Sequence, residues 1–313
     1  MRQIAAALPS LAGHGIPHAG FIGDHVMGSF TAGLLVQAQH RSRAHDGRPC
    51  RPLDHRLAML LLAAAFCLGA VLPAHAAWRP SLTERSFDIQ LSVPLNLVRP
   101  ADILALDLFT TPPERTATLR VHGMATVCHV SAGRWQNWRP DAKSLPDAAL
   151  GRSPSGWPGE RWLDIRHPAL RPVLERRLDL CRDHGFDGVL LADLDGYTRA
   201  SGFPLTPADQ LAFNLWLADA AHRHGLAVGL VDNLGQASEL ADRFDFLVAS
   251  DCLVAGDCAA ALAFSRAGKP VYLVAYTNVV RHMDLLCAEA AALDASLIFK
   301  TRTMNGKLHR RCP

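Results

Sequence analysis

The sequence predicts an α/β protein built as a single (β/α)8 TIM-like barrel. After residue 86, short apolar runs rich in branched residues alternate with longer amphipathic stretches. The later apolar runs are almost continuous, as expected of parallel strands covered on both faces. Eight such runs favour a closed barrel. An open, doubly wound sheet is the alternative, but no glycine-rich phosphate loop follows the first run.

The expected strands are the eight apolar runs, in chain order. They are Phe87–Leu91, Ile103–Phe109, Ala125–Ser131, Gly188–Asp193, Leu226–Asp232, Asp245–Ser250, Val271–Tyr276 and Ser296–Lys300. The first three are shorter or less uniformly apolar than the rest. The last five have the composition of central strands of a parallel sheet.

The stretches between these runs predict helices. The expected helices are Ala169–His184, Pro207–His224, Gln236–Arg243, Cys258–Ala267 and Met283–Asp294. The first carries apolar residues at helical spacing. The second begins with Thr206 as a candidate N-cap and Pro207 at the first helical position. Gly185, Gly225 and Gly268 stand where helix C-caps are expected, just before strands.

One connection, from Arg134 to Arg166, is unusually long and follows the third strand. It holds four of the six tryptophans, which argues against disorder. On a barrel, a loop after a strand lies on the face where active sites form. Long loops in compact domains are often functional, so we expect this one to contribute to a site.

The N-terminal part has the pattern of a secretory leader. The apolar run Leu57–Val71 follows basic residues and ends in Pro73-Ala74-His75-Ala76, a cleavage pattern of small residues. We therefore expect residues 56–76 to be a signal peptide and 77–313 to be the barrel. Residues 1–55 are either an unstructured leader or the result of a start codon assigned too far upstream. The mature protein is expected to be periplasmic or secreted, with no stable membrane anchor after cleavage.

The charge of the chain gives no indication of a nucleic-acid partner. Of 32 Lys and Arg and 29 Asp and Glu, 26 of each lie after residue 76. The net charge of +3 therefore belongs to the leader, and the expected mature part is neutral. A basic footprint for nucleic acid is absent.

Six of the eight cysteines lie in the expected mature part, and export permits disulfides. The spacing favours Cys252–Cys258 and Cys287–Cys312 as disulfides. Cys128 and Cys181 lie within an expected strand and helix, and we expect them to be buried thiols. No pair of cysteines has C-x-x-C spacing, so no metal site is expected.

Three segments carry a family resemblance. They read Gly185-Phe-Asp-Gly-Val-Leu-Leu-Ala-Asp-Leu-Asp-Gly-Tyr197, Ser131-Ala-Gly-Arg-Trp-Gln-Asn-Trp-Arg-Pro-Asp141 and Trp157-Pro-Gly-Glu-Arg-Trp-Leu-Asp164. They resemble signatures of the family-114 glycoside hydrolases, the endo-α-1,4-polygalactosaminidases, and the similarity runs over roughly Phe87 to Cys312. The resemblance implies a barrel that cuts galactosamine-containing exopolysaccharide without a metal or other cofactor.

The resemblance fails where it matters for chemistry. In the family pattern, an Asp after the fourth strand and a Glu after the sixth resemble the nucleophile and the acid/base pair, and these positions are Ala192 and Ser250 here. We therefore expect a catalytically impaired protein, a pseudoenzyme that binds galactosamine-containing polysaccharide. The alternative is an active hydrolase in which the neighbouring Asp193 and Asp251 supply relocated carboxylates.

Other polar and aromatic residues near strand ends are candidate substrate contacts. They are Asp107, Trp135, Trp157, Asp195, Tyr197, Asp232 and Tyr276. Each has a structural alternative. The acid of Asp195 could equally fix a tight turn, and a loop tryptophan could equally anchor its loop to the barrel.

Overall fold

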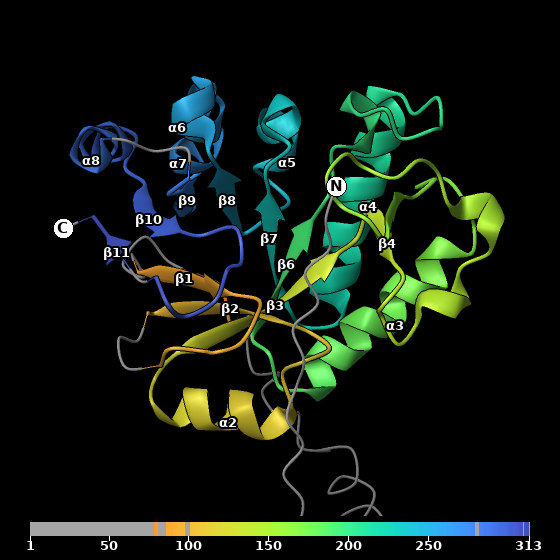
Figure 1. The fold of residues 1–313 in the computed structure, drawn as a ribbon, viewed down its shortest axis with the longest axis horizontal. Helices are drawn as coiled ribbons and strands as arrows, with labels where there is room; N and C mark the ends of the chain where they lie inside the picture. Colours follow the sequence, from red (N-terminus) through yellow and green to blue (C-terminus); the bar gives the residue numbers. More distant parts are fainter. Residues whose placement is uncertain (1–77, 81–85, 98–100, 279–281, 309, 313) are drawn as a thin grey trace, which may run out of the picture. The chain divides into compact units, whose positions relative to one another are not determined.

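The computed structural model describes residues 78–80, 86–97, 101–278, 282–308 and 310–312 (Figure 1). The expected leader (1–55) and signal peptide (56–76) lie outside the described residues. The described part falls within one compact unit, Val71–Pro313.

Eight parallel strands form a single curled sheet, as the sequence predicts. They are β1 (Phe87–Gln90), β2 (Ile103–Asp107), β3 (Ala125–Ser131), β6 (Gly188–Ala192), β7 (Ala227–Val231), β8 (Phe246–Ser250), β9 (Val271–Tyr276) and β10 (Ser296–Lys300). They pair in this order, and the short β11 (Arg310–Arg311) adds antiparallel to β10. The fold class is a (β/α)8 TIM-like barrel. Its two end strands, β1 and β10, are not hydrogen-bonded neighbours in the described sheet.

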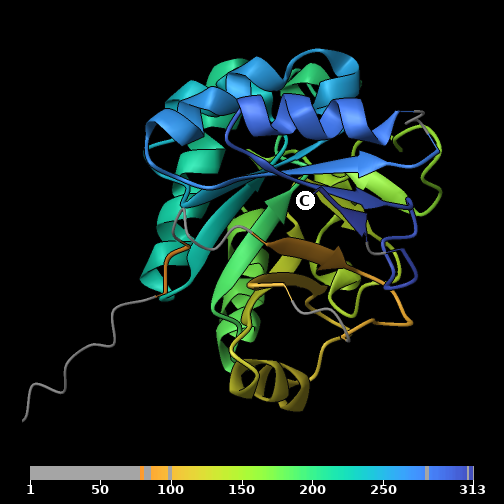
Figure 2. The same ribbon diagram turned by 90° about the vertical axis from the view of Figure 1, so that its left-hand side faces the viewer.

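The helices lie on the outer side of the curved sheet (Figures 1 and 2). They are α2 (Pro113–Val121), α3 (Leu170–Asp183), α4 (Pro207–Arg223), α5 (Ala237–Leu240), α6 (Cys252–Ala255), α7 (Leu262–Arg266) and α8 (Met283–Ala292). Thr206 caps α4 as predicted, in a reciprocal capping box with Asp209.

Two predicted helices are shorter than expected, and α2 and α6 were not predicted. The stretch Gln236–Arg243 contains only the end of the 3-10 helix η4 (Leu234–Gln236) and one turn of α5. The stretch Cys258–Ala267 begins as the 3-10 helix η5 (Cys258–Ala261) before α7. The first stretch follows the left-handed residues Asp232 and Asn233 after β7, whereas the second follows α6, which ends at the left-handed Gly256.

Alternate residues of the strands fill two separate apolar cores. Inside the barrel, a cluster of twelve side chains includes Phe87, Leu190, Phe246 and Tyr272. Outside it, the larger cluster lies between sheet and helices. Gly229 makes the inner packing possible, because a Cβ there would lie 2.3 Å from the ring of Phe246.

Three disulfides link elements of the described part of the chain. Cys252–Cys258 and Cys287–Cys312 are confirmed. The prediction of free thiols at Cys128 and Cys181 was wrong, because these two form a third disulfide, with Cα atoms 6.0 Å apart. Both point into the layer between β3 and α3, and sequence position alone did not reveal that the strand and helix bring them together.

Removal of the Cys128–Cys181 bridge should destabilise the fold more than removal of Cys252–Cys258. The first closes a loop of 53 residues and the second a loop of 6. Loop-closure entropy then predicts losses of about 4 and about 2 kcal/mol in the free energy of unfolding. Urea unfolding of the two double Cys→Ala variants measures this. Free thiols at Cys128 and Cys181 in denatured protein purified without reductant would contradict the bridge.

Candidate functional site

Aspartates directly follow three neighbouring strands at the carboxyl ends of the sheet, which form the mouth of the barrel. Two of them, Asp232 and Asp251, bind the end of the next strand. The backbone N–H of Asp232, after β7, donates to Val248 O of β8 at 2.9 Å, and its Oδ1 accepts from Ser250 N at 2.6 Å. Asp251, after β8, repeats the arrangement on β9. Its N–H donates to Val274 O at 2.8 Å and its Oδ1 accepts from Tyr276 N at 2.9 Å. Each aspartate therefore binds two backbone groups at the end of the next strand.

These aspartates share a left-handed backbone. The φ angles of Asp193, Asp232 and Asp251 are 64°, 55° and 54°. Aspartate tolerates this region better than most residues, because its short polar side chain can bond to nearby backbone. The left-handed residue turns the chain out of the strand, so the side chain no longer follows the alternation of the strand before it.

A polar cavity of about 270 Å³ lies at this end of the sheet, among the segments that follow β6, β7 and β8. Four aspartates are among its lining residues: Asp195, Asp232, Asp251 and Asp257. Ser250, Tyr197 and Arg199 also line it. We call it the acidic cavity. It unites four predicted site residues, Asp195, Tyr197, Asp232 and Asp251.

Burial and like charges make Asp232 the most perturbed acid of the cavity. Burial, together with the negative charges of Asp195 and Asp193, raises its pKa to about 7, against the opposing hydrogen bond from Ser250 N–H. A carboxyl group with this pKa is partly protonated at neutral pH. Burial also raises the pKa of Tyr276 to about 12, so its phenol stays neutral beside Asp232 and Asp251.

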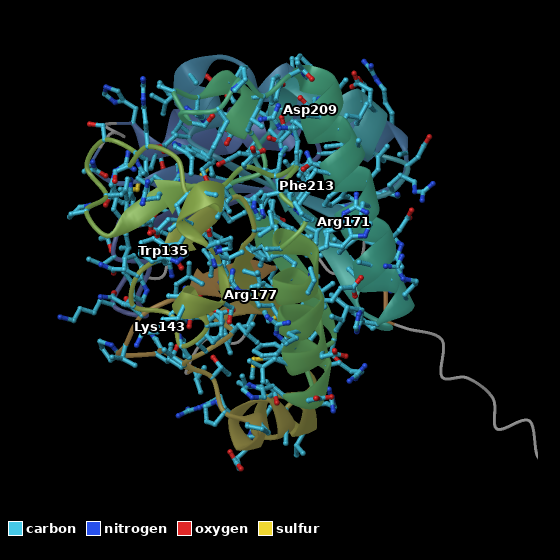
Figure 3. The ribbon with its side chains drawn as sticks, turned by 90° about the vertical axis from the view of Figure 1, so that its right-hand side faces the viewer. Trp135, Lys143, Arg171, Arg177, Asp209 and Phe213 are labelled. Carbon is cyan, nitrogen blue, oxygen red and sulfur yellow. A yellow bond between two sulfur atoms is a disulfide. The ribbon has the colours of Figure 1, made fainter. Side chains whose placement is uncertain are left out.

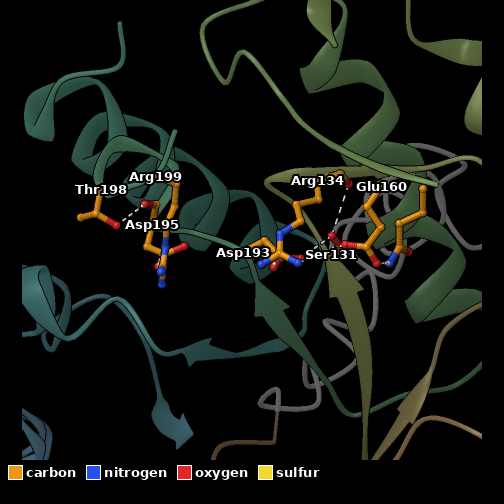
Figure 4. A network of polar contacts seen from close by, with 8 residues as sticks. Ser131, Arg134, Glu160, Asp193, Asp195, Thr198 and Arg199 are labelled. Carbon is orange, nitrogen blue, oxygen red and sulfur yellow. Dashed lines mark hydrogen bonds and ion pairs between the residues drawn. The ribbon is translucent and has the colours of Figure 1, made fainter. Parts of the chain in front are cut away.

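Asp195 is held by its own loop. Its carboxylate accepts from Arg199 Nε at 2.8 Å, and its backbone carbonyl accepts from Thr198 Oγ1 at 2.8 Å (Figure 4). Because Arg199 also lines the cavity, the pair presents both charges there. Both the turn-forming role and the ligand-facing role considered for Asp195 are thus compatible with its position.

Asp193 is committed to a separate network that also holds the long loop (Figure 4). Its Oδ2 accepts from Ser131 Oγ at 2.5 Å, and its Oδ1 lies 2.9 Å from Arg134 Nε. Arg134 in turn pairs with the buried Glu160 at 3.0 Å. Burial raises the pKa of Asp193, and Arg134 and Ser131 oppose that rise. Asp193 does not line the acidic cavity.

The long loop is an ordered structure built on a small hairpin. Strands β4 (Arg134–Gln136) and β5 (Glu160–Trp162) pair antiparallel, and the 3-10 helices η1 (Ala142–Ser144) and η2 (Asp147–Ala149) lie between them. Its start requires glycine at 133, because a Cβ there would lie 1.7 Å from Asp193 O. Sequence reasoning did not single out Arg134 and Glu160 as members of a network, although both lie in the segments that carry the family resemblance.

Two predicted ligand contacts anchor this loop instead of facing the cavity. Trp135 packs on the outer core and donates its indole N–H to Ala142 O at 2.9 Å. Asp107 pairs with Arg139 at 2.6 Å and accepts from two backbone N–H groups. Arg177 lies on α3 (Figure 3). It binds Asp141 through Nε at 2.7 Å and Nη2 at 3.0 Å.

Trp157 lies in a second, larger hollow of about 510 Å³. We call it the basic cleft. Its charged lining residues are Arg134, Arg152 and Arg199, and its aromatic ones are Trp157 and Trp162. Arg199 lines both this cleft and the acidic cavity, so the two are adjacent. Trp157 is 47% exposed and open to a ligand.

Within the residues described, no group of three or more His, Cys, Asp or Glu side chains is arranged to hold a metal ion. A search of the same residues for a helix long and apolar enough to cross a membrane finds none.

Comparisons with known proteins identify the family and support the fold. The model of glycoside-hydrolase family GH114 matches residues 70–312. The chain belongs to family GH114. A crystal structure of Aspergillus fumigatus Ega3 in complex with galactosamine is similar at 30% identity and a TM-score of 0.71, covering 76% of this chain and 99% of that one. The glycoside hydrolase domain of PelA from Pseudomonas aeruginosa shares the fold at 16% identity and a TM-score of 0.55, covering 73% and 98%. No match was found among curated proteins.

Substitution of Asp232 by Asn should change how stability depends on pH. The folded carboxyl keeps its proton up to about pH 7, whereas the unfolded one releases it near pH 4. The unfolded state thus binds fewer protons between these values, and wild-type stability falls as pH rises through this window. Asn cannot ionise, so Asp232→Asn should exceed wild type by about 4 kcal/mol at pH 8 and match it at pH 4.

Chemical unfolding at both pH values measures the difference. Asp257→Asn is the matched control, since that side chain also lines the cavity but is exposed. Parallel pH profiles for wild type and Asp232→Asn would show that Asp232 titrates normally.

Proposed function

We propose that this GH114 protein binds a galactosamine-containing polysaccharide in the acidic cavity and lacks the hydrolytic pair of its family. The observation that carries the proposal is the gathering of four aspartates around one cavity at the carboxyl ends of the strands. An amino sugar carries an ammonium group, which such carboxylates bind by charge-assisted hydrogen bonds. The complex of the similar protein Ega3 with galactosamine supports this ligand class.

Two oxygens remain for a ligand after the structural bonds are made. Oδ1 of both Asp232 and Asp251 is used by backbone N–H groups. The second oxygen of Asp251 has only a distant ion pair with Arg302, at 3.7 Å. Among the described contacts of Asp232, none involves Oδ2. Both carboxylates can therefore bond a ligand without releasing the strands that they hold.

We infer the loss of hydrolysis from the residues at the ends of β6 and β8, which are Ala192 and Ser250. The side chains of Ala192 and Ser250 cannot deliver a proton to a glycosidic oxygen near neutral pH, and Ala192 cannot act as a nucleophile. The neighbouring Asp193 is engaged by Ser131 and Arg134 through both oxygens. It is thus a poorer substitute than its position in the sequence suggests.

A second candidate function, residual hydrolysis, is favoured by one observation: the pKa of Asp232, about 7. A carboxyl group that keeps its proton at neutral pH suits a general acid. Asp251 or Asp195, in the same cavity, would then act as the second carboxylate. This candidate differs from the active hydrolase considered from the sequence, because Asp232 takes the place of Asp193 as one of the two relocated carboxylates.

We further propose that the protein is exported as a periplasmic or secreted protein by the segment 56–76. Three disulfides in the described part support an oxidising compartment.

Removal of the cavity's charge should weaken binding of galactosamine oligomers. We expect Asp232→Asn/Asp251→Asn to raise the Kd of a galactosamine tetrasaccharide about tenfold or more, because two charge-assisted bonds become neutral ones. The fully N-acetylated tetrasaccharide should change little. Calorimetric titration measures both, with Asp242→Asn as the control. Asp242 is exposed and acts electrostatically on Lys269, which binds the loop before β8. Equal losses in control and variant would refute a site in the cavity.

Restoring the family's acids should restore cleavage. We expect no reducing ends from wild type acting on a partly N-acetylated galactosamine polymer, and detectable release from Ala192→Asp/Ser250→Glu. Ala192→Asn/Ser250→Gln is the isosteric control, because it lacks both the general acid and the nucleophile. Cleavage by wild type that falls about 10²- to 10⁴-fold in Asp232→Asn would instead establish the second candidate function.

A further inference from the structure

We propose that the basic cleft binds an anionic sugar unit, a hexuronate whose carboxylate is held by Arg152. The cleft is lined by three arginines and two tryptophans and by no acidic residue. Its charge is thus opposite to that of the acidic cavity beside it. A unit with an ammonium group would be repelled there, whereas a carboxylate matches the planar guanidinium fork.

The three arginines are not equally free. Arg134 is paired with Asp193 and Glu160, and its guanidinium stacks over the Trp162 ring at 4.5 Å. Arg199 is paired with Asp195. For Arg152, no hydrogen bond or ion pair of the side chain is present among the described residues. The positive charge of Arg152 is therefore the uncompensated one.

The backbone of Arg152 is held by hydrogen bonds, although its guanidinium has no partner among the described residues. Its N–H donates to Ser201 O at 2.7 Å, and its carbonyl accepts from Trp162 N–H at 2.9 Å. The backbone is thus tied both to the loop after β6 and to β5. A guanidinium that starts from an ordered backbone loses less entropy when it binds a ligand than one on a mobile segment.

Trp157 supplies the apolar part of the site. Trp157 is 47% exposed. Its backbone N–H donates to Pro154 O, and its carbonyl accepts from the backbone N–H of Glu160. An exposed indole beside a guanidinium gives a platform for a pyranose ring and a partner for its acid group. The cleft volume of about 510 Å³ accommodates a sugar unit.

The position of Arg199 joins the two hollows into one binding surface. A chain lying across it would meet carboxylates on one side and guanidinium groups on the other. If the proposed function is right, the natural ligand is then a polysaccharide that contains both amino sugar and uronic acid, not galactosamine alone. The uronate site itself does not depend on what the acidic cavity binds.

The test uses trigalacturonic acid and its methyl ester, which differ in charge and little in shape. We expect the purified protein to bind the acid about tenfold or more tightly than the ester, with quenching of tryptophan fluorescence. Arg152→Met should lose this preference and leave the affinity for galactosamine tetrasaccharide unchanged. Arg266→Met is the control, since it removes an exposed positive charge on α7, outside the cleft.

The outcomes separate the two proposals. Equal affinity for acid and ester, an equal loss in Arg266→Met, or binding of the galactosamine oligomer without the galacturonate would overturn the uronate site. Binding of the galacturonate without the galactosamine oligomer would leave the uronate site standing and refute the proposed function. Thermal unfolding of each variant confirms that the comparison is made on folded protein.

Discussion

The bonds between strand-end aspartates and the next strand are the constraint on which the mouth of this barrel depends. After β7 and β8 the same device recurs: a left-handed aspartate whose N–H and carboxylate bind two backbone groups of the following strand. Such charge-assisted bonds hold the ends of the sheet where strand pairing stops. The segments that line the acidic cavity after β7 and β8 begin at these aspartates, so the same bonds fix where those segments start.

The same chemistry recurs at the opposite end of the sheet, on aspartates that do not line the acidic cavity. Asp187 donates its N–H to Thr126 O and accepts from Thr126 N, and Asp245 does the same with Val228. Aspartate next to a strand is therefore first a structural residue in this fold. At the mouth, Asp232 differs in that burial raises its pKa to about 7, a perturbation typical of functional sites.

The sequence predicted the scaffold well and the site in part, for physical reasons. Apolar periodicity located all eight parallel strands, because burial on both faces leaves a composition that one sequence reveals. The Cys128–Cys181 bridge escaped, because it depends on how β3 and α3 face each other. The raised pKa of Asp232 escaped for the same reason, since it arises from burial and from charges on other loops. Trp135 and Trp157 look alike in sequence, yet one anchors the loop and the other is open to solvent.

The same constraint explains why Asp193 differs from its two counterparts. Asp232 and Asp251 bond to strands that continue the sheet, whereas Asp193 faces Ser131 and Arg134, where the long loop leaves β3. The loop brings Arg134 and Glu160 with it, and these two charges neutralise each other as an ion pair. Asp193 is a second carboxylate on the same guanidinium and ties it to the end of β6. Its removal would leave the Arg134–Glu160 pair without the second carboxylate and would loosen a guanidinium that lines the basic cleft. Neighbourhood in sequence to Ala192, where the family resemblance leads one to expect an acid, is thus a weak guide to function, because the carboxylate of Asp193 is already bound to the start of the long loop.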